Sequence, residues 1–115
     1  MEYHTTHPLL AYPMYREDMP STARDLIDVI GWPATRALIM EYGGAFVAIP
    51  LGKNNNAAGA ARYEHFVEVI GADCADKLIS VYGGDELPIP TCVRAIARAR
   101  QRRIQARFDA GATVR

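Results

Sequence analysis

Hydrophobic residues recur at helical spacing and then in a short continuous run in the first half of the chain. Between residues 21 and 31, apolar side chains fall three or four apart and Gly31 closes the run, which predicts an amphipathic helix. Residues 33–44 begin on a proline, keep the helical spacing and end on two glycines, which predicts a second helix. Residues 45–50 are mainly apolar and end on a proline, so we expect a brief strand there.

The same pattern recurs forty residues later. When residues 26–50 are aligned with residues 66–90, ten of the twenty-five positions are identical, in the groups Val-Ile-Gly, Leu-Ile, Tyr-Gly-Gly and Ile-Pro. Such self-similarity at a fixed offset is typical of a duplicated structural unit. We therefore predict two helix-helix-strand repeats, over residues 21–50 and 62–90.

The two predicted strands need a partner. Pro88 has no backbone donor, which restricts the second strand to an edge position, and a two-stranded ribbon is marginal alone. The strands should pair with each other or with strands of a second subunit, or else pack as ordinary intrachain core. The candidates for this inter-repeat or inter-subunit sheet are Phe46, Val47, Ile49, Leu87 and Ile89.

Three segments lie outside the repeats. Residues 1–20 mix prolines and tyrosines without a period, which predicts an extended N-terminal arm. Residues 51–61 are small and polar and predict a solvent-facing linker, while residues 91–115 predict a long helix to about Ala110. The expected fold is mostly α with short β-strands: a duplicated helix-helix-strand unit followed by a long basic C-terminal helix.

The predicted C-terminal helix has an apolar stripe flanked by cations. On a helical wheel the larger apolar side chains share one side, which we expect to pack, and the alanines form the outer face. The stripe is Val93, Ala97, Ile104 and Phe108, and the outer face is Ala95, Ala99 and Ala106. The cations on the two shoulders, our candidates for binding nucleic acid or an acidic partner, are Arg94, Arg98, Arg100, Arg102, Arg103 and Arg107.

A net charge of zero conceals a strong polarity along the chain. Residues 1–90 hold six basic and twelve acidic side chains, whereas residues 91–115 hold seven arginines and one acid. Arginine has a planar fork suited to phosphate and carboxylate groups. This asymmetry indicates an anionic partner, docking against the acidic remainder of the fold or of a second copy, or simply a solvated cationic face.

Length and composition exclude several other classes of protein. The 115 residues allow one domain or two very small ones, and no apolar run approaches the roughly 18 residues of a membrane span. We expect no signal peptide, and two cysteines without paired spacing favour a reducing, cytoplasmic setting. His4 and His7 lack further metal ligands, and Cys74 aligns with Ala34, which favours a packing role. We therefore expect no enzyme activity, metal, cofactor or small-molecule substrate.

The order of these features resembles the Mor family of phage transcription activators, over about residues 22–115. The resemblance is carried by the helix that ends in Tyr82-Gly83-Gly84, the strand that ends in Ile89-Pro90, and the Arg-rich segment 102–111. It implies that the helix-helix-strand part forms an intertwined homodimer and that the first helix of a DNA-binding helix-turn-helix follows it in the chain. The resemblance further implies a role in transcription regulation in the cytoplasm of a bacterial host.

The second helix of that motif has no counterpart here, since four residues follow Gly111. We expect either a shortened form or a natural short derivative of the family. One alternative is a phage-encoded inhibitor, of anti-CRISPR type or directed at RNA polymerase, that blocks a host complex by protein-protein binding. Another is a purely structural role, in which the arginines pair with the acidic first ninety residues.

Overall fold

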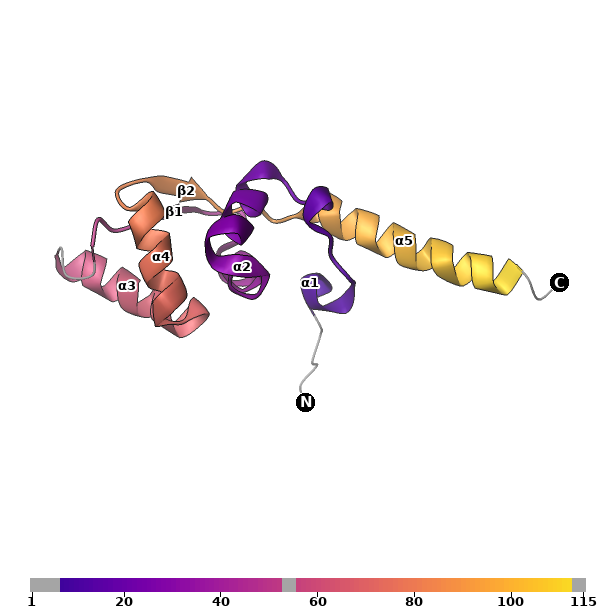
Figure 1. Cartoon of the computed structure of the whole chain (residues 1–115), viewed down its shortest axis with the longest axis horizontal. Coiled ribbons are helices and arrows are strands. Elements are labelled where there is room, and N and C mark those ends of the chain that lie inside the picture. The colour runs from indigo at the N-terminus through magenta and orange to yellow at the C-terminus, as the bar shows by residue number, and fades with distance from the viewer. Residues whose placement is uncertain (1–6, 53–55, 113–115) are drawn as a thin grey trace. The chain divides into compact units, whose positions relative to one another are not determined.

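The computed structural model of the chain describes residues 7–52 and 56–112. The chain divides into two compact units, the first made of residues 1–19 and 92–115 and the second of residues 20–91. The expected fold class is confirmed: the structure is mostly helical, with two short antiparallel strands and a long C-terminal helix (Figure 1).

The second unit contains both repeats. The first repeat forms α2 (Ser21–Tyr42) and β1 (Phe46–Ala48), and the second forms α3 (Ala57–Ile70), α4 (Ala72–Tyr82) and β2 (Glu86–Pro88). α2 consists of two helical stretches joined at a kink at Gly31, whose backbone is not helical, so it corresponds to α3 and α4 together. Each repeat is therefore helix, helix, strand, as the sequence predicts.

The bend between the two helices of each repeat has the same backbone conformation. Gly31 has φ 84° and ψ 166°, and Gly71, forty residues later, has φ 87° and ψ 161°. A side chain disfavours this positive-φ region, which explains why both repeats use glycine here. The repeat in sequence is thus also a repeat in conformation.

The first glycine of each Tyr-Gly-Gly group is required for a close approach of backbones. A Cβ atom on Gly43 would lie 2.6 Å from the carbonyl oxygen of Ile39, and one on Gly83 would lie 2.6 Å from that of Ile79. The glycines end α2 and α4 without this clash, and the chain turns directly into β1 and β2.

The two strands pair with each other in a register that is symmetric between the two repeats. Val47 lies opposite Leu87, its own counterpart in the alignment, with Phe46 opposite Pro88 and Ala48 opposite Glu86. The flanking hydrogen bonds also come in equivalent pairs: Gly44 donates to Ile89 at 2.7 Å, and Gly84 donates to Ile49 at 2.9 Å. The two repeats are therefore related by a pseudo-two-fold axis through the Val47–Leu87 pair.

The core of this unit draws equivalent residues from both repeats. Leu26 and its counterpart Phe66 are fully buried, and so are Leu38 and Leu78. Four of the five predicted sheet residues are also buried, namely Val47, Ile49, Leu87 and Ile89. The sheet is therefore inter-repeat, within one chain. Phe46 is the exception, because it faces outward from the ribbon and is 70% exposed.

Three boundaries differ from the sequence prediction. The linker predicted over residues 51–61 is shorter, because α3 already begins at Ala57, where the Asn56 side chain accepts a hydrogen bond from the Gly59 backbone N–H at 2.8 Å. The arm predicted over residues 1–20 contains a short helix, α1 (Pro8–Ala11), and a 3-10 turn, η1 (Arg16–Asp18). The C-terminal helix, α5 (Val93–Ala112), runs past its predicted end.

Candidate binding surface on the C-terminal helix

α5 and the N-terminal arm together form the first compact unit. The helix has no proline, and its alanines and arginines are strong helix formers, so a long helix is expected from local preference alone. Cys92, directly before it, has φ 61°, which is uncommon for a residue with a side chain, and its carbonyl accepts the first hydrogen bond from Ile96.

The predicted packing side of α5 is wrong. Ala95 and Ala99, assigned to the outer face, are buried together with Cys92, whereas Ala106 is exposed as predicted. Val93, Ile104 and Phe108, assigned to the packing stripe, are 66%, 52% and 69% exposed. The physical reason is steric, because small side chains let another segment of backbone come close to this side of the helix.

The arm holds two of the candidate arginines through Asp18. The side chain of Asp18 is only 11% exposed, and its Oδ2 lies 2.6 Å from Nη1 of Arg102, while Nη1 of Arg98 lies 4.0 Å from Oδ1. The Arg102 guanidinium also stacks over the Tyr15 ring at 4.4 Å. A nearly buried carboxylate and a ring face make this contact stronger than an exposed ion pair.

Arg103 binds a neighbouring part of the same arm. Its Nη1 donates to the backbone carbonyl oxygen of Ala11 at 2.9 Å, and its guanidinium lies 5.7 Å from the Tyr12 ring. Arg98, Arg102 and Arg103 are therefore engaged within the first unit, which agrees in part with the structural role weighed from the sequence.

The other three candidate arginines are free within the described residues. Arg94, Arg100 and Arg107 are exposed, and the described part of the chain offers their side chains no ion pair, hydrogen bond or aromatic ring. They flank the exposed apolar stripe. We call this combination the exposed face of α5, made of Val93, Arg94, Ala97, Arg100, Ile104, Arg107 and Phe108.

Two grooves follow the line where the arm meets α5. One encloses about 300 Å³ and is lined by Arg100, Arg103 and Arg107, with Ile104, Ala11 and Tyr12. The other encloses about 540 Å³ and is lined by Pro13 and Tyr15 of the arm and by Ala99, Arg102, Arg103 and Ala106 of the helix. The smaller groove thus brings three arginines together with Ile104 and two residues of the arm.

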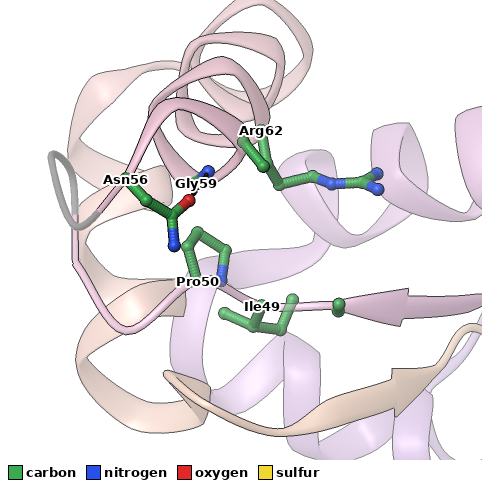
Figure 2. Close-up of a pocket in the computed structure, with 7 residues that line it drawn as sticks. Ile49, Pro50, Asn56, Gly59 and Arg62 are labelled. Atoms are coloured by element: carbon green, nitrogen blue, oxygen red, sulfur yellow. Dashed lines mark hydrogen bonds between the residues drawn. The ribbon is translucent and has the colours of Figure 1, made fainter.

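A third cavity, in the second unit, lacks comparable chemistry. It encloses about 240 Å³ at the start of α3, beside Ile49 and Pro50. Figure 2 shows the Asn56 side chain turned toward Gly59, whose N–H it caps, and the Arg62 side chain extending away from both. The Gly59 N–H at this helix terminus is thus already capped by the chain itself.

The described residues contain no group of three histidine, cysteine or acidic side chains able to hold a metal. His7 accepts a hydrogen bond from the Leu9 N–H, and His4 lies outside the described residues. Cys74 donates to the Ile30 carbonyl at 3.6 Å, whereas His65 lies beside Glu41 and Glu68. Burial raises the pKa of the Cys92 thiol to about 11, which keeps it protonated at neutral pH.

Sequence reasoning found the arginines but missed their partners Tyr12, Tyr15 and Asp18. The available signal was an arm rich in tyrosine in a chain with a cationic helix, since arginine stacks on aromatic rings.

In the described part of the chain, no helix combines the length and the apolar character that crossing a bilayer requires. Comparison with protein-family models, with curated proteins and with solved structures found no match.

Proposed function

We propose that this chain is a non-enzymatic regulatory protein, similar to the Mor-type activators, that binds nucleic acid or an acidic partner through α5. The observation that carries the proposal is the division of the arginines into two sets. Arg98, Arg102 and Arg103 fix the arm on the helix. Arg94, Arg100 and Arg107 have no partner in the described chain and present three guanidinium groups along one exposed face.

Salt dependence tests the nucleic-acid version of this proposal. If the three free arginines each neutralise one phosphate, duplex DNA affinity should fall with a log-log salt slope near −2.7, or roughly 40-fold between 50 and 200 mM salt. Fluorescence anisotropy of a labelled duplex measures this slope. A flat salt dependence would exclude binding through phosphates.

Two triple variants separate binding from folding. Replacing Arg94, Arg100 and Arg107 with Gln should abolish the salt-dependent binding and leave the melting temperature unchanged, because these side chains make no contact in the described chain. Replacing Arg98, Arg102 and Arg103 with Gln should instead lower the stability of the arm, because it removes the Asp18 pairs and the hydrogen bond to the Ala11 carbonyl. The reverse pattern would contradict the division into two sets.

The second candidate function is a phage-encoded inhibitor that blocks a host complex through protein-protein binding. The exposed side chains of Val93, Ile104 and Phe108 favour it, since a phosphate backbone offers nothing for apolar side chains to pack on. In either role we propose that the protein acts in the cytoplasm, where its two free thiols would stay reduced.

If the protein forms the proposed homodimer, its subunits must meet through a surface other than the β1–β2 ribbon. The strands that the sequence assigned to repeats or to subunits already pair within one chain. Self-association would then have to use a different part of the molecule, and analytical ultracentrifugation of the full chain measures whether it occurs.

A further inference from the structure

The exposed face of α5 joins apolar and cationic side chains in a pattern suited to a protein groove. Val93, Ile104 and Phe108 are each more than half exposed, and they lie on one side of the helix with Ala97 between them. The stripe from residue 93 to residue 108 spans about 22 Å at 1.5 Å per residue. Anchors at such helical spacing are the pattern by which an amphipathic helix enters an apolar groove.

We propose that this face docks into an apolar groove with an acidic rim on a partner protein. The inference rests on the proposed function, binding through α5, and names the class of partner. The apolar stripe would fill the floor of the groove, and Arg94, Arg100 and Arg107 would meet carboxylates on its rim, because they flank the stripe and have no partner in the described chain.

The smaller groove between the arm and α5 supports an acidic partner in particular. It encloses about 300 Å³ and brings Arg100, Arg103 and Arg107 together beside Ile104. Arg103 is engaged with the arm, whereas Arg100 and Arg107 have no partner in the described chain and can donate charge-assisted hydrogen bonds to a carboxylate. An acidic side chain of the partner can therefore enter this groove while its apolar neighbours cover Ile104 and Phe108.

Other occupants of the face fit it less well. A second copy packing through the same face would set arginine flanks against arginine flanks, and like charges repel. A DNA backbone would pair with the arginines but would leave Ile104 and Phe108 exposed to water. The free energy available from burying these two side chains would then not contribute to binding. The charge and the apolar area of the exposed face of α5 together thus favour a partner protein over a second copy or DNA.

The test compares four probes with the full chain. The calcium-loaded C-terminal lobe of calmodulin supplies an acidic-rimmed apolar groove that accepts basic amphipathic helices of many sequences. Poly-glutamate supplies negative charge without a groove, mixed-sequence duplex DNA supplies phosphates, and vesicles with phosphatidylserine supply an anionic apolar surface. We expect the calmodulin lobe to bind with a Kd of about 10 µM or tighter, and the other three probes to bind more weakly.

Substitutions on the face identify which side chains carry the binding. Ile104→Ser with Phe108→Ser should weaken binding to the lobe by about 100-fold, and Arg100→Gln with Arg107→Gln by about tenfold. Phe46→Ser removes an equally exposed aromatic ring in the second unit, and Lys77→Gln removes an exposed cation there. Both of these control variants should bind like the parent chain.

Several outcomes would overturn the inference. Arginine-dependent binding to DNA that ignores the Ile104 and Phe108 substitutions, without lobe binding, would sink it while leaving the proposed function intact. Tighter binding to vesicles would assign the face to a membrane. A dimer that the double serine variant dissociates would assign it to a second copy. A melting temperature lowered only by that variant would mean that the face packs against the chain itself. Failure to bind any probe would remove the proposed function as well.

Discussion

A buried hydroxyl group marks a residue at which the two repeats differ. Thr35 in α2 is fully buried, and its Oγ1 has no hydrogen-bond partner among the described residues. The equivalent residue in α4 is Ala75, which is equally buried and has no polar atom in its side chain. The first repeat therefore has a buried hydroxyl group at a position where the second repeat packs with only a small apolar side chain.

Thr35→Val should stabilise the protein. The substitution keeps the branched shape and removes a hydroxyl whose desolvation is uncompensated, so we expect a gain of about 1 kcal/mol in the free energy of unfolding. Thermal unfolding should show a melting temperature about 4–8 °C higher. Thr91→Val, at an exposed position, is the control and should have little effect. A lower melting temperature for Thr35→Val would mean that the hydroxyl is hydrogen-bonded after all.

The thiol of Cys92 should react slowly. Cys74→Ala, which copies Ala34 of the first repeat, leaves Cys92 as the single thiol. With a pKa of about 11 rather than 9.0, its thiolate fraction near pH 8 is about 100-fold lower than for an ordinary thiol. Iodoacetamide labelling followed by mass spectrometry should therefore accelerate only as the pH approaches about 11. A midpoint near 9 would contradict burial of this side chain.

The same raised pKa gives a direction for stability against pH. Burial favours the neutral thiol in the folded state, so its stabilising effect is complete below the unfolded pKa near 9.0 and is lost as the pH rises toward 11. Burial raises the pKa of Tyr42 and of its counterpart Tyr82 as well. All three groups therefore lower stability in alkaline solution.

At the scale of elements, Asp18 is the charged partner in the contact between the arm and α5. Asp18→Asn would leave Arg98 and Arg102 without their charged partner, while Glu17→Gln changes an exposed neighbour in the same turn. Losing a charge-assisted contact of this kind costs about 2 kcal/mol, so amide hydrogens in η1 should exchange about 30-fold faster. Hydrogen exchange measured by mass spectrometry should show this for Asp18→Asn alone. Equal exchange in both variants would mean that Asp18 does not hold the arm.

The elements show what periodicity can and cannot predict. Apolar spacing and paired glycines located both repeats, since the bend at Gly31 and the stops at Gly43 and Gly83 are local requirements of the backbone. The start of α3 was missed because an alanine-rich segment carries no apolar period. The buried side of α5 was missed because its cover, the arm, is about ninety residues away in sequence, and a helical wheel does not record such a contact.

The whole molecule has an internal symmetry that a single sequence could only suggest. Forty-residue self-similarity indicated two equal units, but it left open whether their strands paired within or between chains. The Val47–Leu87 register settles this within the chain, and the equivalent pairs Leu26 with Phe66 and Leu38 with Leu78 fill one core. Each repeat buries its apolar surface on the other, so neither has a complete core alone.

An isolated repeat should therefore be unfolded at low concentration and should fold by pairing with its own copy. In a chain of residues 20–52, Val47 would lie opposite Val47 of the second copy, in place of Leu87. Circular dichroism should show helicity that rises with concentration, and sedimentation equilibrium should show a dimer forming over the same range, because folding is coupled to association. Val47→Asp, which places a charge on the axis, should abolish both signals. Helicity independent of concentration would mean that one repeat carries its own core, and the pseudo-two-fold pairing would then not be what stabilises the fold.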